Sequence, residues 1–520
     1  MPTKKQKTIS VMDTTLRDGE QTPGVSYTPS EKLHMSRLLL TDVNVDRVEI
    51  ASARVSEGEL EGALRVTDWA RQEGLIERIE MLGFCDGERS VDWILCAGGS
   101  CINLLAKGSE HHCQQQLGIT AQKHRERICQ TIDYALSKDL QVNIYLEDWS
   151  NGVRDNYSYV SDILDELQNF PISRILLADT LGVLSPDKVR RLIALMVAGW
   201  PNTQFDYHGH NDYGFATANS IAAIQSGATG IHTSVNGLGE RAGNTSLAEI
   251  VTAIADHTDY KTNINESRLA SISAVVETFS GKNIAENSPI LGNDVFTQTA
   301  GIHADGDAKG NLYATSLSPD RFGRERRYAL GKLSGKASLD HNLDKLGINL
   351  SDTNRNKVLG RIIELGDKKH TVVPEDLLMI IADVLKTPAE HLVKIDSYKI
   401  NVSSAEAPEA TVSVSYQGRT SFSSATGEGG YDAFVKAVEE AVLEYGIQIP
   451  QLTDYRVRIP PGGRTEALVE TLIRWNDPKK RFGFFTVGVD SDQTAAAVIA
   501  TEKMLNIVAH ENNALGRAPK

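Results

Sequence analysis

A regular alternation of short apolar runs with longer amphipathic stretches between residues 9 and 260 constrains this chain more than any other feature. The runs are rich in β-branched residues, and the stretches between them, such as 30–40, 121–136, 186–196 and 216–224, have the period of helices. Eight strand-plus-helix units in about 250 residues predict a (β/α)8 barrel. The predicted strands are Ile9 to Thr15, Asp46 to Ser52, Arg78 to Phe84, Ile102 to Lys107, Gln141 to Asp148, Arg174 to Asp179, Gln204 to His210 and Gly230 to Asn236.

A doubly wound open sheet is the alternative fold for the same alternation. Such sheets usually have fewer strands and often carry a glycine-rich turn after the first one, which this chain lacks. We therefore expect an α/β TIM barrel over residues 1–270. Helical linker subdomains are expected over 271–390, and an α+β C-terminal domain over 391–520.

The composition limits the classes of function. The chain has 520 residues, a net charge of −14 and a pI near 5.5. This acidic balance argues against a general nucleic-acid-binding surface or a polybasic membrane anchor, although it leaves open a phosphorylated ligand in a local basic pocket. No apolar stretch that could serve as a signal peptide follows the basic N-terminus, and no apolar run is long enough to span a bilayer. We expect a cytoplasmic protein. Its five cysteines form no Cys-x-x-Cys pair and indicate neither a disulfide framework nor a zinc ribbon.

Polar residues gather at the ends of five predicted strands. The carboxyl ends of barrel strands open into one mouth, so these residues are expected to share a site. An arginine beside a carboxylate just past a strand suits metal-assisted chemistry on a carbonyl, although in isolation such a pair is more often a solvated turn. The strand-end residues are Arg17 and Asp18, Glu147 and Asp148, Asp179 and Thr180, His208 to His210, and Asn236 to Asn244.

His208 and His210 form the sharpest pair. Residues two apart in a strand face the same side, so both imidazoles can enter the barrel mouth. With Asp18 they make a set of two histidines and one carboxylate that leaves positions open for substrate. Two histidines hydrogen-bonded in a polar loop are the alternative. Mixed nitrogen and oxygen ligands suit Mg2+, Mn2+, Co2+ or Zn2+, and the sequence does not choose among them.

The glycines of the loop after the eighth strand do not make a dinucleotide site. Gly237, Gly239 and Gly243 have the wrong spacing, and the loop follows the last strand rather than the first. We expect these glycines to let the backbone curl so that Asn244 reaches the metal.

A glycine-rich segment from Thr297 to Tyr313 carries His303, Asp305 and Tyr313. We expect it to be a loop, and a loop of this composition is more often functional than a spacer. An ordered linker with a capping histidine is the alternative.

The last 130 residues contain an internal repeat, because 398–402 resembles 455–459. Each copy continues into an alternating strand, a third strand and an alanine-rich helix, so two βββα units are expected, with the helices covering one face of the sheet. Glycine- and proline-rich loops between the units suit a small ligand, and structural dimerisation is the alternative role.

Together, the runs 13–21, 208–212 and 236–244 resemble the 2-isopropylmalate, citramalate and homocitrate synthase family. The resemblance covers essentially the whole chain, and the C-terminal repeat looks like that family's allosteric leucine or isoleucine domain. It implies a homodimeric acyltransferase that condenses acetyl-CoA with a 2-oxo acid on a divalent metal in a barrel.

The same resemblance implies roles by position. Arg17 would polarise the 2-oxo acid carbonyl, Glu147 would remove a proton from the acetyl methyl group, and Thr180 would hold the substrate carboxylate. His303 and Tyr313 resemble residues that the family brings from beyond the barrel, often from the partner subunit. The implied metal ligands are Asp18, His208, His210 and Asn244.

The choice of 2-oxo acid depends on three residues. Tyr145 lies two residues before Glu147, so both face the site. A tyrosine fills room that isopropylmalate synthases leave for a branched chain, and Leu82 and Leu105 resemble the apolar wall of citramalate synthases, which fits the methyl group of pyruvate. Ordinary barrel core is the alternative for all three. A pocket discriminates by about 1–3 kcal/mol per methylene, so side activity on 2-oxobutyrate is expected.

We therefore expect a citramalate synthase that is inhibited by isoleucine. A 2-isopropylmalate synthase, with leucine as inhibitor, shares every catalytic residue and is the main alternative. A lyase of the same barrel family seldom carries the C-terminal repeat, and an amino-acid sensor without activity would have lost Glu147 or a metal ligand. The expected contacts of the inhibitor are Tyr431, Asp432, Leu452, Tyr455 and Ile459.

Overall fold

The computed structural model describes residues 6–345, 348–367, 372, 376–377, 380–381, 384, 392–458, 469–476 and 484–514. By their internal contacts the residues divide into two compact units. The first comprises Met1–Phe296 and Thr315–Glu325, and the second comprises Thr297–Ala314 and Arg326–Lys520. This division assigns 271–296 and 315–325 to the same unit as the barrel. No helix among the described residues is long and apolar enough to cross a membrane.

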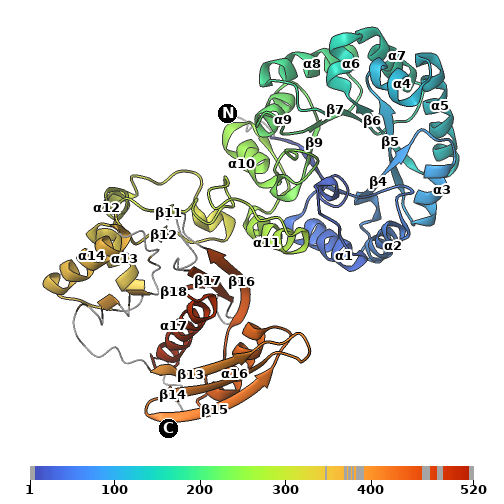
Figure 1. Ribbon diagram of the computed structural model, residues 1–520. Helices are drawn as coiled ribbons and strands as arrows, with labels where there is room; N and C mark the ends of the chain where they lie inside the picture. The colour runs from blue at the N-terminus through green and yellow to red at the C-terminus, as the bar shows by residue number, and fades with distance from the viewer. Residues whose placement is uncertain are drawn as a thin grey trace. The chain divides into compact units, whose positions relative to one another are not determined.

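The first unit is a closed barrel of eight parallel strands with helices around it (Figure 1), which confirms the predicted fold class. Each strand pairs with the next along the chain, and the last pairs with the first. The strands are β2 Ser10–Asp13, β3 Arg47–Ser52, β4 Ile79–Phe84, β5 Cys101–Lys107, β6 Gln141–Glu147, β7 Arg174–Asp179, β8 Phe205–Gly209 and β9 Gly230–Thr233.

The surrounding helices begin at recognisable caps. Thr28 and Glu31 form a capping box at the first helix. At three later helices, the side chain of the N-cap residue accepts a hydrogen bond from the backbone amide of the third helical residue. These N-cap residues are Ser56, Ser109 and Thr120. The surrounding helices are α1 Pro29–Arg37, α2 Glu57–Gln72, α3 Arg89–Cys96, α4 Glu110–Leu117, α5 Ala121–Ser137, α6 Trp149–Asp155, α7 Tyr157–Leu167, α8 Pro186–Gly199, α9 Ala216–Gln225, α10 Leu247–His257 and α11 Leu269–Ser280.

The first and last barrel strands are shorter than predicted. β2 ends at Asp13 because the carbonyl of Thr14 accepts the amides of Arg17, Asp18 and Gly19 at 3.1, 2.8 and 3.0 Å, which turns the chain out of the sheet. β9 ends at Thr233 for a similar reason, since the chain then enters a 3-10 turn. The polar residues after both strands are thereby released into the mouth of the barrel.

Charged residues fill the floor of the barrel, at the amino ends of the strands. Arg47 reaches Glu80 at 3.2 Å and Asp206 at 2.6 Å, and Arg174 reaches Glu80 at 3.4 Å. A short parallel pair, β1 Lys7–Thr8 with β10 Tyr260–Lys261, lies outside the barrel sheet. Above the floor, the interior changes to an apolar cluster that contains Met12, Leu82, Tyr145, Leu176 and Ala178.

The second unit begins where a loop was predicted, and that prediction is wrong. Residues Gly301–Gly310 form helix α12, which ends at Asn311 in a left-handed conformation. The glycines serve close packing instead of flexibility: a Cβ on Gly301 would lie 2.6 Å from the nitrogen of Gly335, and one on Gly306 would lie 2.6 Å from the Tyr313 ring. The neighbouring elements are β11 Thr297–Gln298, β12 Arg327–Tyr328, α13 Lys336–Lys345 and α14 Asp352–Asp367.

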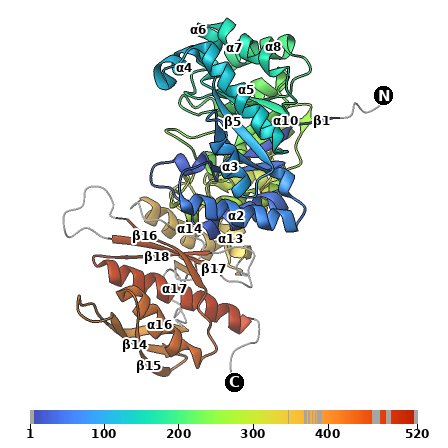
Figure 2. The ribbon, with the colours of Figure 1, turned by 90° about the vertical axis from the view of Figure 1, so that its right-hand side faces the viewer.

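The C-terminal part of this unit has the predicted double βββα architecture. The repeats match in detail, because the first strand of each copy carries an irregularity at an equivalent place, between Ile395 and Ser397 and between Leu452 and Asp454. The strands form two separate three-stranded sheets and not the one sheet that was predicted, and in Figure 2 the two helices lie between these sheets. The elements are β13 Val393–Asn401, β14 Glu409–Tyr416, β15 Arg419–Thr426 and α16 Gly430–Leu443, then β16 Gln451–Arg458, β17 Val469–Asn476, β18 Phe484–Asp490 and α17 Gln493–Ala514.

Candidate active site

Three side chains converge at the carboxyl end of the barrel. The Asp18 carboxylate oxygen Oδ2 lies 3.1 Å from His208 Nε2 and 4.0 Å from His210 Nε2, and the two Nε2 atoms lie 3.3 Å apart. Potential ligand atoms of all three residues lie within 4.8 Å of one another, and all three residues are buried. Two imidazole nitrogens and a carboxylate at this spacing are suited to a divalent cation.

The chain places these three groups by simple local rules. His208 lies on β8 and His210 follows its end, so the two alternate residues share a face, and the turn after β2 brings Asp18 opposite them. An isolated bridge joins His210 to Asn244. The loop after β9 therefore reaches the same mouth.

Electrostatics keeps Asp18 and His210 in cation-binding forms. Burial raises the pKa of the Asp18 carboxyl, but Arg17, His208 and His210 outweigh burial and hold the pKa well below its usual range. Burial and the neighbouring His208 lower the pKa of His210 to about 4. An ionised carboxylate and a neutral imidazole are the forms that bind metal ions.

Asn244 offers a further oxygen. Its Nδ2 donates to the carbonyl of Leu238 at 3.0 Å, whereas its Oδ1 is buried and has no hydrogen-bond partner among the described residues. The glycines allow this placement: a Cβ on Gly239 would lie 2.5 Å from Asn244 Nδ2, and one on Gly243 would lie 1.9 Å from the carbonyl of Gly237. The donor set and the unpaired oxygen both fit a metal ion.

Arg17 lies beside this set. Its Nε donates to Glu49 at 2.5 Å, its Nη2 donates to the Tyr145 hydroxyl at 3.2 Å, and its Nη1 lies 3.4 Å from Asp18. Burial alone would lower the pKa of Arg17, yet Glu49 and Asp18 raise it above its usual range. A fixed guanidinium cation next to the candidate metal site is suited to binding an oxyanion.

The three residues predicted to form the pocket wall lie in the barrel interior. Leu82 and Tyr145 belong to one buried apolar cluster, against which Leu105 packs. The Tyr145 hydroxyl is held between Arg17 and His232 Nδ1, which lies 2.9 Å away. The Tyr145 ring stands edge-on to the ring of His208, with centroids 5.8 Å apart. The three predicted wall residues thus lie together near the metal-binding set.

Glu147 and Thr180 close neighbouring strands of the same mouth. Glu147 forms an ion pair with Lys107, its partner in the β5–β6 ladder. The Thr180 hydroxyl accepts the amide of Asp148 at 2.8 Å, and the Thr180 carbonyl accepts Arg241 Nη2 at 2.7 Å.

Two residues that were not predicted, Lys107 and Glu49, contact the site. Lys107 ends the fourth predicted strand, and the rule that selected the other polar strand ends also applies to it. Glu49 had a weaker signal, which was a carboxylate inside an otherwise apolar strand run.

His303 and Tyr313 belong to the second unit, where they contact each other. Their ring centroids lie 4.3 Å apart, and His303 Nδ1 lies 3.2 Å from Gln298 Oε1. Asp307 accepts the Tyr313 amide at 3.3 Å and pairs with Arg326. The structure thus brings the two predicted residues together on α12 and the turn that follows it.

The expected inhibitor contacts gather in part. The rings of Tyr431 and Tyr455, from different repeats, have centroids 5.0 Å apart, and the Tyr431 hydroxyl lies 2.8 Å from Thr501 Oγ1. Asp432 is exposed and pairs with Lys436 at 2.7 Å, and Leu452 is partly exposed. Ile459 lies outside the described residues.

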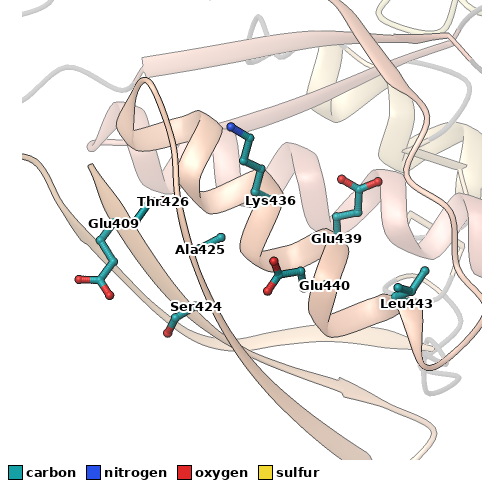
Figure 3. A pocket seen from close by; sticks show the side chains of 8 residues that line it. All are labelled: Glu409, Ser424, Ala425, Thr426, Lys436, Glu439, Glu440 and Leu443. Carbon is teal, nitrogen blue, oxygen red and sulfur yellow. The ribbon is translucent and has the colours of Figure 1, made fainter. Parts of the chain in front are cut away.

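An open cavity of about 560 Å³ lies elsewhere in the same domain, between β15 and α16 (Figure 3). None of the four expected inhibitor contacts that the structure describes lines it. Its lining residues are Glu409, Ser424, Ala425, Thr426, Lys436, Glu439, Glu440 and Leu443.

The fold and the site define the structural class of the protein. It is an α/β barrel with a site of two histidines and one carboxylate at its mouth, followed by a C-terminal domain of two repeats. Three family models match in succession. One described as HMGL-like matches residues 8–276, one described as homocitrate synthase post-HMGL domain-like matches 290–370, and one described as the LeuA allosteric (dimerisation) domain matches 371–509.

Curated relatives narrow the class. The (R)-citramalate synthase CimA of Methanocaldococcus jannaschii is 34% identical over 509 residues, which cover 96% of this chain and 99% of the relative. The putative (R)-citramalate synthase CimA of Methanopyrus kandleri is 33% identical over 472 residues, 91% of each chain. A probable 2-isopropylmalate synthase of Methanopyrus kandleri is 33% identical over 471 residues, 90% of this chain and 92% of the relative. The chain belongs to the citramalate and 2-isopropylmalate synthase family of HMGL-like, acetyl-CoA-condensing transferases.

Proposed function

We propose that this protein is an (R)-citramalate synthase, which condenses acetyl-CoA with pyruvate and hydrolyses the thioester to release citramalate and CoA. The observation that carries this proposal is the placement of Tyr145. Its hydroxyl is tied to Arg17 and its ring stands against His208, while Leu82 and Leu105 lie in or against the same cluster. Such a wall would favour a small 2-oxo acid over one with a branched chain. The names of several relatives agree with it.

The proposed metal site consists of Asp18, His208, His210 and Asn244. A divalent cation held there, Mg2+, Mn2+, Co2+ or Zn2+, would supply Lewis-acid polarisation of the 2-oxo acid carbonyl. Arg17 would act on the same carbonyl oxygen through its cationic guanidinium, which Glu49 and Tyr145 hold beside Asp18.

Glu147 would start the reaction as the general base. Its carboxylate takes a proton from the methyl group of acetyl-CoA, and the electron pair of the broken C–H bond forms the enolate. The enolate carbon then attacks the carbonyl carbon of pyruvate to form a C–C bond, and Arg17 neutralises the negative charge that appears on oxygen. Water hydrolyses the thioester, which releases CoA and makes the condensation irreversible.

Thr180 would position the carboxylate of pyruvate. Its hydroxyl accepts the Asp148 amide and so has its proton free for a substrate oxygen, and Arg241 fixes its carbonyl. His303 and Tyr313 would complete the site in a homodimer, as residues of the partner subunit. Their mutual contact on α12 supports a joint role.

Isoleucine would be the inhibitor, bound in the C-terminal domain, with leucine as the alternative if the enzyme makes isopropylmalate. The contact between Tyr431 and Tyr455 supports a ligand site where the two repeats meet. A coupling of about 1–3 kcal/mol between inhibitor and active site would be typical.

The test is release of free CoA thiol by the purified protein with acetyl-CoA and Mg2+ or Mn2+, comparing pyruvate, 2-oxobutyrate and 2-oxoisovalerate. Pyruvate is expected to give the highest kcat/KM, with weaker turnover of 2-oxobutyrate. Preference for 2-oxoisovalerate would make the protein a 2-isopropylmalate synthase instead, and thiol release with none of the three would refute both assignments.

A further inference from the structure

The proposed mechanism gives no role to Lys107, which forms an ion pair with Glu147. The two residues end adjacent strands, β5 and β6, and are direct partners in the ladder. The Lys107 side chain is only 9% exposed, whereas that of Glu147 is 23% exposed. Burying an ammonium group this deeply costs free energy unless the group is paired. Lys107 is therefore the buried partner of the ion pair, and the Glu147 carboxylate is the partner that is more exposed at the mouth.

The backbone of Lys107 is fixed by a closed circuit of hydrogen bonds. Its amide donates to His124 Nε2 at 3.3 Å, and its carbonyl accepts the Tyr159 hydroxyl at 3.0 Å. His124 Nδ1 lies 2.8 Å from the same hydroxyl, and the two rings are stacked with centroids 6.4 Å apart. Helices α5 and α7 thus contribute one buried side chain each to hold this single residue.

The directions of these bonds agree with the charge state of His124. Burial lowers the pKa of His124 to about 4, with Lys107 and Arg127 adding to the effect. A neutral imidazole that accepts at Nε2 carries its proton on Nδ1 and donates it to the Tyr159 oxygen. The Tyr159 proton is then free for the Lys107 carbonyl. Every donor and acceptor of the circuit is satisfied.

Other charged groups around Glu147 have partners of their own. The Asp148 carboxylate faces His112 of α4 at 3.5 Å, and Arg154 of α6 pairs with Asp155 at 2.7 Å. On the neighbouring strand β7, the Asp179 carboxylate accepts two backbone amides at 3.1 Å. Among the described residues, Lys107 is the cation that pairs with Glu147.

We infer that Lys107 is a positioning residue for the base: it holds the Glu147 carboxylate at the mouth in one orientation. The inference rests on the proposed role of Glu147. A carboxylate without its cation is easier to protonate in a partly buried site and is free to rotate. Lys107 itself forms no bond with the reacting atoms in this account.

The test compares Lys107→Met and Lys107→Arg with the wild type by kcat, KM and the pH profile of kcat/KM. Lys107→Met is expected to lower kcat by about 100-fold and to move the acid limb of the profile to higher pH by about one to three pH units. Activity should therefore partly recover as the pH is raised. Lys107→Arg keeps the charge and should keep the acid limb.

Lys123→Met is the matched control, because it removes the same charge from an exposed pair on α5 and should leave the profile unchanged. Lys107→Gln replaces Lys107→Met if the latter does not fold. An unmoved acid limb with unchanged kcat in the uncharged variant would overturn the inference.

A second readout separates this inference from the proposed function. Infrared difference spectra of wild type against Glu147→Gln isolate the carboxyl band of Glu147, and Lys107→Met should move its titration to higher pH whether or not the protein turns over acetyl-CoA. A band that titrates identically in both proteins would overturn the role of Lys107. Absence of thiol release by the wild type would instead refute the proposed function.

Discussion

The two ends of the barrel contrast in how their buried polar groups are satisfied. At the floor, Arg47 lies between Glu80 and Asp206, and Arg174 approaches Glu80 from the other side. At the mouth, Asp18 Oδ1 and Asn244 Oδ1 are buried without a hydrogen-bond partner among the described residues. The floor pairs each of these charges with a counter-ion from the chain, although Asp206 Oδ1 also lacks a hydrogen-bond partner among the described residues. The mouth instead gathers carboxylate and imidazole ligand atoms within 4.8 Å of one another.

This difference separates two kinds of buried polar group in the barrel: those that stabilise the fold and those that are available to bind a ligand. Two buried charges that pair with each other are compatible with a stable fold. Removing one partner leaves the other charge buried and unpaired, which lowers the free energy of unfolding. A buried polar atom without a partner calls for an explanation outside the chain, such as a metal ion or substrate. Substitutions at the floor should therefore change stability, and those at the mouth should change turnover.

The largest effect is expected at the mouth. Glu147→Gln keeps the shape of the side chain and removes the base, so kcat should fall by about 10²- to 10⁴-fold. The melting temperature should fall only moderately, because the glutamine amide oxygen can still accept a hydrogen bond from the buried Lys107 ammonium group. Steady-state thiol release and thermal unfolding measure the two quantities. A variant that retains most of its turnover would show that another group is the base.

The floor should show the opposite behaviour. Arg47→Met leaves Glu80 and Asp206 buried without their shared cation, which should cost about 3–5 kcal/mol of unfolding free energy. Arg154→Met, at an exposed ion pair, should cost less than about 1 kcal/mol. Chemical denaturation measures both, and equal losses in the two variants would break the contrast.

Acid should destabilise the barrel through its neutral histidines. Burial lowers the pKa of His124 from 6.5 to about 4, so the unfolded chain binds this proton at a higher pH than the folded barrel does. The contribution is fully present above pH 6.5 and is lost as the pH falls toward 4. At 1.36 kcal/mol per pKa unit it is on the order of 3 kcal/mol. Denaturation across this window should show a weaker pH dependence for His124→Gln, and an identical dependence would contradict the assignment.

The smallest effect concerns specificity. Leu105→Ala enlarges the wall near Tyr145 and should shift kcat/KM from pyruvate toward 2-oxoisovalerate by about 10- to 200-fold, corresponding to about 1–3 kcal/mol. Leu176→Ala, in the same apolar cluster, is the control for general loosening. An unchanged ratio in Leu105→Ala alone, with turnover retained, would remove Leu105 from the pocket.

Sequence periodicity predicted the barrel because eight buried strands leave an unmistakable apolar pattern. The gathering of Asp18, His208 and His210 followed from the rule that strand ends share one mouth, and the structure brings them together. Helix α12 was missed because glycine ordinarily opposes helix formation. In α12, the missing side chain of Gly301 lets the backbone approach Gly335. This contact is between residues far apart in the chain, so the local sequence pattern does not show it.

The contacts that individual side chains make could not be predicted from the sequence pattern either. Nothing in the run Ile102 to Lys107 shows that Lys107 pairs with Glu147, since that pairing depends on the register between β5 and β6. The polar floor was hidden for the same reason, because Arg47, Glu80 and Asp206 come from three separate strands.

The contrast between the two ends is tested most directly by titrating Mn2+ into metal-stripped protein, followed by calorimetry or electron paramagnetic resonance. We expect one saturable site per chain that is lost in Asp18→Asn at the mouth and retained in Asp206→Asn at the floor. A wild type without saturable binding, or binding that survives Asp18→Asn, would contradict it.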